Sequence, residues 1–263
     1  MLKKLLKYDL KSMFKGLFIF YSLSLFFGVL TRIFFSIEAS FIMNIIAKVC
    51  SGVSISMIFN ILINNLMRLW GRFKQNLYGD ESYLTHTLPV DKKTLYLSKI
   101  LTAIITLFVS IIVISLTLFI AYYSKENIEI IKTILLPVAD AYNSTIIKIL
   151  FAILFVFFLE FANILQSGYT GIIIGHRKNN NKTGFSVLFG FVVYMITQII
   201  SLLMIFITGL FNSDIMNLFF TNEIININMI KVIIYIAIII YTISLFVIYF
   251  VNLKLFKKGV NVD

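Results

Sequence analysis

The chain has 263 residues, of which 60% are apolar, 16% aromatic and only 13% charged. Soluble domains contain about 45–50% apolar and about 25% charged residues, so this composition excludes a water-soluble globular protein. It also excludes a disordered chain, because disordered segments are poor in apolar residues. The net charge of +11 would suggest nucleic-acid binding in a soluble protein. In a chain this apolar, the position of the charges is more informative than their number.

Six stretches with few charged residues are long enough to cross a bilayer, which takes about 20 mostly apolar residues in a helix. They are residues 16–37, 49–67, 100–124, 149–175, 184–210 and 232–253. Backbone in lipid must satisfy its own hydrogen bonds, so each stretch is predicted to be a helix. We therefore expect an all-α polytopic membrane protein in which residues 1–263 form one transmembrane domain.

The basic residues lie mainly on one side of these predicted spans. Seventeen of the 23 lysines and arginines fall in residues 1–15, the 68–99 loop, the 176–182 loop and the C-terminal tail. By the positive-inside rule, these segments and both termini face the cytoplasm. Most of the net charge is then a topological signal, and a nucleic-acid partner is not expected. The predicted location is the cell membrane.

Residues 1–15 have an amphipathic helical pattern. Apolar side chains occupy positions 2, 5, 6, 10, 13 and 14, and lysines occupy positions 3, 4, 7, 11 and 15. Such a segment is typical of a helix that lies in the lipid interface, with its lysines near anionic headgroups. The alternative is a basic flank of the first span that happens to be helical.

The predicted cytoplasmic loop, residues 68–99, mixes charges with large apolar side chains, among them Trp70, Tyr83 and Leu84. Exposed apolar groups of this kind usually mark a docking surface. Either Asp80 or Ser82 is suited to cap a short helix, and Pro89 is expected to end it near Leu88. Asp91 is then predicted to cap the helix that enters the third span.

One part of this loop resembles a known family. The run is Tyr78-Gly79-Asp80-Glu81-Ser82-Tyr83-Leu84-Thr85-His86-Thr87-Leu88-Pro89-Val90, followed by Leu95 and Ser98-Lys99. It is similar to the loop between the second and third helices of ABC-2 type transporter permeases. The six spans, the amphipathic start and the cytoplasmic termini agree with the architecture of that family.

The resemblance implies a coupling helix in this loop, seated in a cleft of a separate ATP-binding subunit. The residues expected to make this contact are Asp80, Glu81, Tyr83, Leu84, Leu88, Pro89 and Val90. It further implies that ATP and Mg are bound by the partner, that two permease subunits form the pathway as a homo- or heterodimer, and that the last outer loop contains short helices. Small six-helix relatives include exporters of phenol-soluble-modulin toxins and antimicrobial-peptide immunity pumps.

The chain lacks the residues that catalysis or nucleotide binding would need. A phosphate-binding loop needs two spaced glycines before Lys-Thr, but Asn181 and His176 stand at the corresponding places before Lys182-Thr183. The two histidines, His86 and His176, have no Cys or carboxylate companions at metal-ligand spacing. We therefore expect no catalytic residue, no metal and no cofactor on this chain, and no ATPase activity.

Polar and small residues within the spans are further candidates. Glu160 falls near the middle of the fourth span, where a charge costs about 3 kcal/mol or more, so it is a candidate for the transport pathway or for a switch. The alternative is a structural carboxyl that is hydrogen-bonded to a neighbouring helix, for example to Asn60 or Gln198. Ser167, Gly171 and Gly175 are spaced by four residues, which favours close helix contact, either in a dimer seam or within one subunit.

The resemblance implies an exporter permease, with amphipathic peptides such as antimicrobial or toxin peptides as the expected cargo and lipid-like or drug substrates as the alternative; an apolar interior with few fixed charges suits such cargo. An ion-coupled secondary transporter would use intramembrane carboxylates and internal repeats. One such carboxylate, Glu160, and no repeat are found. An intramembrane hydrolase would need paired catalytic groups at membrane depth, and neither histidine falls within a predicted span.

Overall fold

The computed structural model describes residues 1–37, 41–220 and 227–258, and almost all of these residues are helical. They form nine helices and no strand, and six of the helices are long and apolar enough to cross a membrane. The prediction of an all-α fold is thereby confirmed, and the six helices of spanning length and hydropathy support the prediction of a multi-pass membrane protein. The helices pack as two compact units, Met1–Glu129 and Ile130–Asp263. That the two units form one transmembrane domain stays a prediction.

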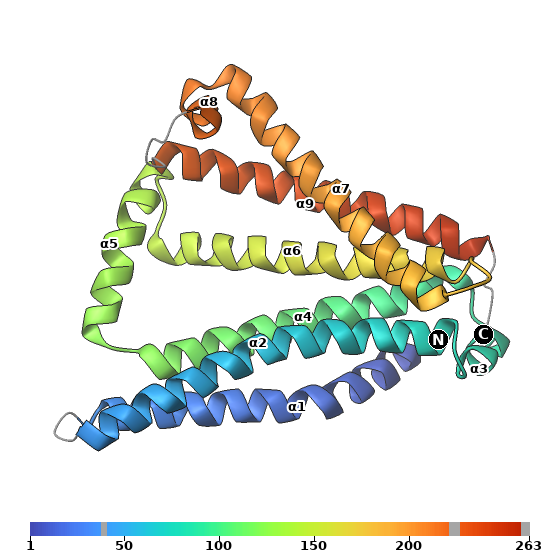
Figure 1. Ribbon diagram of the computed structural model, residues 1–263, viewed down its shortest axis with the longest axis horizontal. Coiled ribbons are helices and arrows are strands. Elements are labelled where there is room, and N and C mark those ends of the chain that lie inside the picture. The colour runs from blue at the N-terminus through green and yellow to red at the C-terminus, as the bar shows by residue number, and fades with distance from the viewer. Residues whose placement is uncertain (38–40, 221–226, 259–263) are drawn as a thin grey trace. The chain divides into compact units, whose positions relative to one another are not determined.

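The first unit contains α1 (Leu2–Phe35), α2 (Phe41–Leu77), α3 (Ser82–Thr87) and α4 (Lys92–Tyr122). Helices α1, α2 and α4 run side by side (Figure 1). One face of α1 is buried, at intervals of three or four residues: Asp9, Met13, Leu17, Tyr21, Ser24, Gly28 and Thr31. On this face the Tyr21 hydroxyl lies 2.8 Å from Ser110 Oγ of α4, and Asn65 of α2 donates to the same oxygen at 2.8 Å. Apolar packing and hydrogen bonds between hydroxyl and amide side chains therefore hold the three long helices together.

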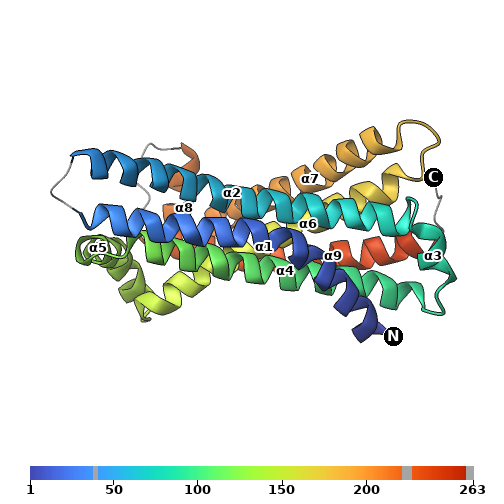
Figure 2. The same cartoon turned by 90° about the horizontal axis from the view of Figure 1, so that it is seen from below.

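The amphipathic N-terminal segment is the first part of α1, and no break separates it from the span. Its five lysines are exposed, whereas Asp9 and Met13 are buried on the stripe that continues into the span. Figure 2 shows the N-terminal end of α1 bending away from the line of the rest of the helix. The location of this segment in a lipid interface stays a prediction.

The helices extend beyond the apolar stretches of the sequence. Helix α2 has 37 residues, which at 1.5 Å per residue is about 55 Å, and the hydrocarbon layer is about 30 Å thick. Residues 68–77 therefore belong to α2 and residues 92–99 to α4, so the loop predicted at 68–99 is reduced to residues 78–91. An apolar run marks the part of a helix suited to lipid, whereas helical hydrogen bonding continues until a turn interrupts it.

The second unit contains most of α5 (Lys125–Ala141), together with α6 (Ile146–Gly175), α7 (Lys182–Phe211), α8 (Ser213–Phe220) and α9 (Ile227–Lys257). Helix α6 packs against both α7 and α9. The short α8 lies in the last predicted outer loop and folds back on α7, where the rings of Phe206 and Phe219 are 5.4 Å apart. The rest of that loop, residues 221–226, lies outside the described residues.

Glycines bring α6 and α7 into backbone contact. A Cβ atom on Gly171 would overlap the carbonyl of Ser186 and lie 2.5 Å from the backbone nitrogen of Gly190. A Cβ atom on Gly175 would lie 2.5 Å from the backbone nitrogen of Ser186. Close approach of this kind strengthens dispersion contacts in a membrane, where no hydrophobic effect holds helices together.

We expect Gly171→Ala to destabilise the protein by about 1–3 kcal/mol, because the added methyl group overlaps the backbone of α7. The control is Gly52→Ala in α2, where a Cβ atom would have no atom within 4 Å apart from its chain neighbours and the nearby backbone of its own helix. That change should be neutral or slightly stabilising, since alanine favours a helix by about 1 kcal/mol over glycine. Thermal unfolding in detergent measures both, and equal effects of the two substitutions would contradict the contact.

Candidate functional site

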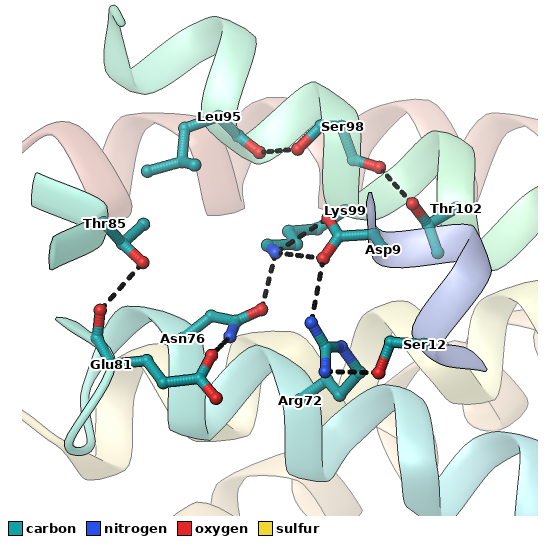
Figure 3. A network of polar contacts seen from close by, with 10 residues as sticks. All are labelled: Asp9, Ser12, Arg72, Asn76, Glu81, Thr85, Leu95, Ser98, Lys99 and Thr102. Carbon is teal, nitrogen blue, oxygen red and sulfur yellow. Dashed lines mark hydrogen bonds and ion pairs between the residues drawn. The ribbon is translucent and has the colours of Figure 1, made fainter. Parts of the chain in front are cut away.

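A cluster of buried and partly buried charged and amide side chains lies in the first unit, at the end that carries α3 (Figure 3). It consists of Asp9, Arg72, Asn76, Glu81 and Lys99, which we call the Lys99 cluster. These residues come from α1, α2, the turn before α3, and α4. Asp9 is only 6% exposed and Lys99 only 7%. Charges so far from solvent are stable only when they are paired and hydrogen-bonded.

Lys99 is the centre of the cluster. Its ammonium group donates to Oδ1 and Oδ2 of Asp9 at 2.9 and 2.8 Å, and to Oδ1 of Asn76 at 2.7 Å. A lysine ammonium has three protons, so these three acceptors satisfy it completely. The result is that one side chain of α4 ties α1 and α2 together.

Arg72 adds a second link between α1 and α2. One terminal guanidinium nitrogen lies 3.3 Å from Oδ1 of Asp9, and the other donates to Oγ of Ser12 at 2.6 Å. Asp9 therefore interacts with two cations. The fourth charged member, Glu81, supplies the second carboxylate, so two positive and two negative side chains balance within the cluster.

Asn76 joins this ion pair to the turn that precedes α3. Its carbonyl oxygen accepts from Lys99, and its amide nitrogen donates to Oε2 of Glu81. Glu81 is the N-cap residue of α3, and its backbone oxygen accepts from the Thr85 hydroxyl at 2.9 Å. A continuous chain of polar contacts thus runs from Asp9 through Lys99 and Asn76 to the start of α3.

One side of helix α3 packs against the end of α2, and the opposite side is exposed. Ser82 is buried, and His86 Nε2 lies 3.1 Å from the backbone oxygen of Leu77 at the end of α2. On the opposite side Tyr83 is 67% and Leu84 74% exposed, and Leu88 is also exposed. Helix α3, which has six residues, therefore exposes large apolar side chains, whereas hydrogen bonds of Glu81 and His86 hold it to α2.

The details of the turns around α3 differ in part from the sequence analysis. Neither Asp80 nor Ser82 caps α3, because Glu81 occupies the N-cap position and directs its side chain to Asn76. Asp91 does cap α4, since its carboxylate accepts from the backbone nitrogen of Thr94 at 3.2 Å. Hydrogen bonding to Thr94 holds the pKa of Asp91 below its ordinary value.

The remaining predicted contact residues surround α3. Asp80 and Pro89 are exposed, and Glu81 and Val90 are partly buried. Val90 closes a tight turn by donating its backbone N–H to the oxygen of Leu88 at 2.7 Å. The predicted contact residues therefore lie in one short segment, of which Glu81 is the member joined to the Lys99 cluster.

Glu160 lies in the second unit, apart from the Lys99 cluster. Its Oε1 accepts from the Tyr194 hydroxyl at 2.7 Å and from the Gln198 amide at 3.1 Å, both on α7. Of the two partners suggested by the sequence, Gln198 is found. Asn60 instead donates to the backbone oxygen of Ser56 in its own helix. Glu160 therefore has a hydrogen-bond partner of the kind expected if it is a structural carboxyl bonded to a neighbouring helix.

The small residues of α6 lie against α7 within the same chain. Gly171 and Gly175 make the backbone contacts described above, and Ser167 is buried in α6, with its backbone oxygen 3.4 Å from the position of a Cβ on Gly190.

In the described part of the chain, no three His, Cys, Asp or Glu side chains are grouped so as to hold a metal ion. His176 Nδ1 lies 2.8 Å from the backbone oxygen of Ile172.

The Lys99 cluster is not among the sites predicted from the sequence. In the sequence, Asp9 stands among the lysines of residues 1–15, Arg72 is read as a topological charge, and Lys99 is read as a topological charge and as the end of the motif that begins at Tyr78. A signal was present, because Asp9 lies four and eight residues before Met13 and Leu17, on the stripe that buries the rest of α1. A lone carboxylate on the apolar face of a basic helix predicts a buried cationic partner.

No known protein family, curated protein or solved structure matches the chain. The resemblance to ABC-2 permeases therefore rests on the motif at residues 78–90 and on the six-span architecture.

Breaking the cluster from one side should strongly destabilise the first unit. Lys99→Met leaves Asp9 and Asn76 without their main donor, and Asp9→Leu leaves the Lys99 ammonium unpaired, so each is expected to cost about 3–5 kcal/mol. The double variant should cost clearly less than the sum, because it leaves no unpaired charge in the Asp9–Lys99 pair. Denaturation in detergent measures this coupling.

The matched control is Lys93→Met, an exposed lysine in the first turn of α4. It should change the free energy of unfolding by less than about 0.5 kcal/mol. Strictly additive effects of Lys99→Met and Asp9→Leu would mean that the ion pair does not form.

Proposed function

We propose that the chain is the transmembrane permease subunit of an ATP-driven ABC exporter of the ABC-2 type. In this proposal, α3 is the coupling helix and docks on a separate ATP-binding subunit that holds ATP and Mg. Two permease subunits form the pathway as a homo- or heterodimer, and both termini lie in the cytoplasm. The chain itself has no ATPase activity.

The observation that carries the proposal is the exposed apolar side of α3. Tyr83 and Leu84 are mostly exposed, yet they lie in a segment surrounded by charged residues such as Lys74, Lys92 and Lys93. A charged environment of this kind is typical of the aqueous side of a membrane protein, where an apolar patch is better explained by a protein partner than by lipid. The motif at residues 78–90 supports an ATP-binding subunit as that partner.

The Lys99 cluster supplies a physical route for the force. Glu81 at the start of α3 contacts Asn76, which contacts Lys99, which holds Asp9. When the partner displaces α3, these contacts resist separation, so the ends of α1, α2 and α4 move with it. An apolar side chain at position 99 would remove α4 from this chain of polar contacts, and force would still pass from α2 to α1 through Arg72, which contacts Asp9 and Ser12.

The cargo is proposed to be an amphipathic or antimicrobial/toxin peptide. The second unit contains a groove of about 520 Å³ between α7 and α9, lined by apolar side chains and by the hydroxyl-bearing Thr170, Thr197 and Ser244. Such a lining suits an apolar segment of a peptide, and it equally suits lipid-like or drug substrates, which remain the alternative.

A function of a different class, ion-coupled secondary transport, is favoured by one observation. Glu160 is an intramembrane carboxyl that two side chains of α7, Tyr194 and Gln198, hydrogen-bond directly. Ion-coupled secondary transporters use intramembrane carboxylates of this kind. The two functions differ in whether ATP and a partner subunit are required.

We expect Leu84→Asp to leave the permease folded but uncoupled from ATP hydrolysis. A charge in the apolar docking patch should weaken binding of the ATP-binding subunit by about 2 kcal/mol or more, which is roughly thirtyfold in affinity. The measurement is co-purification of an ATP-binding subunit from native membranes, together with substrate-stimulated ATPase activity. The control is Lys258→Asp, which places the same residue at an exposed position on the predicted cytoplasmic side, outside α3. Transport by the chain alone in liposomes without ATP would contradict the proposal.

Glu160→Gln should retain export within about twofold, because glutamine still accepts from the Tyr194 hydroxyl. Glu160→Leu should destabilise the protein by about 1–3 kcal/mol, since it leaves the donors of Tyr194 and Gln198 unsatisfied. Export assays and unfolding in detergent measure the two effects. Complete loss of transport in a folded Glu160→Gln variant would instead favour the ion-coupled alternative.

A further inference from the structure

Helix α5 has an apolar side over residues 130–138 and a charged side opposite to it. Two sets of apolar residues spaced by four lie next to each other on one side of the helix, namely Ile130, Ile134 and Val138 and, beside them, Ile131 and Leu135. The charged residues gather on the opposite side: Lys125, Glu126, Glu129, Lys132 and Asp140. No span is predicted here from the sequence, because five charged residues in 17 exclude a membrane-spanning helix.

Only part of the apolar side of α5 is covered by protein. Val138 and Ala139 are buried against Ile149 of α6, with Leu135 packed at the edge of this group. Ile130, Ile131 and Ile134 continue the same side of the helix but are exposed, Ile134 to 63%. Three adjacent isoleucines are therefore left without a protein partner among the described residues.

The C-terminal end of α5 is fastened firmly to α9. Lys231 donates its ammonium to the backbone oxygen of Ala141 at 2.9 Å, and the Tyr142 hydroxyl donates to the backbone oxygen of Lys231 at 2.7 Å. The Lys231 ammonium also lies 5.2 Å from the centre of the Tyr142 ring. A cation at a helix C-terminus favours the helix through its dipole. Asn143 ends the segment in the left-handed region, with φ 47°.

The N-terminal end of α5 is fastened to the end of α4. Ser124 Oγ accepts from the backbone nitrogen of Asn127 at 3.0 Å, and the Asn127 amide donates to the backbone oxygen of Tyr122 at 2.8 Å. Only residues 123 and 124 separate α4 from α5, and four residues separate α5 from α6. Because α4 and α6 are candidate spans, α5 lies at a membrane boundary whichever way the protein is oriented.

Figure 1 shows α5 running across the starts of α6 and α9 and not parallel to them. If α6 and α9 cross the bilayer, a helix crosswise to them lies along its surface. The exposed isoleucines would then meet the boundary between headgroups and acyl chains, and the charged side would meet water. A helix with one continuous apolar side and low net hydrophobicity is typical of this location.

We propose that α5 is an interfacial helix whose Ile130, Ile131 and Ile134 insert into the lipid bilayer. Insertion fixes the depth at which α6 and α9 begin in the membrane. The attraction is hydrophobic and does not depend on anionic lipid, because the polar side of α5 has two lysines against three carboxylates. This differs from the N-terminal part of α1, which has five lysines and one carboxylate. The proposal is independent of the transport function.

The test places a single tryptophan on either side of α5. In a Trp70→Phe background, which removes the one native tryptophan, Ile134→Trp is compared with the control Lys132→Trp on the opposite side. The whole chain is reconstituted in phosphatidylcholine vesicles brominated near the headgroup end of the acyl chains, and iodide serves as the aqueous quencher. We expect bromine to quench the tryptophan at position 134 severalfold more than that at 132, and iodide to show the reverse order.

Two results would overturn the proposal. Equal quenching of both positions by iodide would place the isoleucine side in water, and protection of position 134 from both quenchers would mean that protein, such as a second copy of the chain, covers it. Replacing a third of the lipid by phosphatidylglycerol should leave the bromine quenching at 134 unchanged, and a strong dependence would contradict the hydrophobic basis.

If Trp70→Phe prevents folding, a spin label supplies the same comparison. Labels at Ile134→Cys and Lys132→Cys in a Cys50→Ser background report relative access of oxygen and of a water-soluble nickel complex. Preferential oxygen access at position 134 alone supports the proposal, and equal access at both positions overturns it.

Discussion

The first unit depends on complete compensation of one buried charge. Lys99 has three ammonium protons and three acceptors, two oxygens of Asp9 and one of Asn76. A buried ammonium group with fewer acceptors would destabilise the folded state, because desolvation of an ion costs several kcal/mol. The three acceptors come from two other helices, so α1, α2 and α4 must be assembled together for Lys99 to be buried at all. A buried charge of this kind specifies one arrangement of the helices as well as contributing to stability.

The two units use different means to bring their helices together. In the first, hydroxyls and amides on α1, α2 and α4 meet in pairs, as at Tyr21 and Ser110. In the second, the absence of side chains at Gly171 and Gly175 lets the backbones of α6 and α7 touch. Both means suit a membrane, where apolar surface gains little by moving from lipid into protein and where small or polar residues therefore determine which helices pair.

The Lys99 cluster also relates the structure to the proposed function. A coupling helix is useful only if its displacement reaches the spans, and α3 alone is a helix of six residues with one buried residue, Ser82. The contact from Asn76 to Glu81 gives this short helix a connection to α4 and α1. The same contact explains why Glu81, which the motif marks as a docking residue, turns inwards while Tyr83 and Leu84 face outwards.

The sequence by itself determined the all-helical class, the six spans, the cap at Asp91 and the short helix before Pro89, because apolar run length and capping chemistry are local properties. It determined neither the true ends of the helices nor α5, since helical hydrogen bonding continues past the apolar runs and the segment between α4 and α6 combines charges with isoleucines. Only the tertiary structure decided that Asp9 meets Lys99, 90 residues later in the chain. The reason is physical: a charge is stable in a buried position only beside a partner, and which partner it meets depends on how α1, α2 and α4 pack.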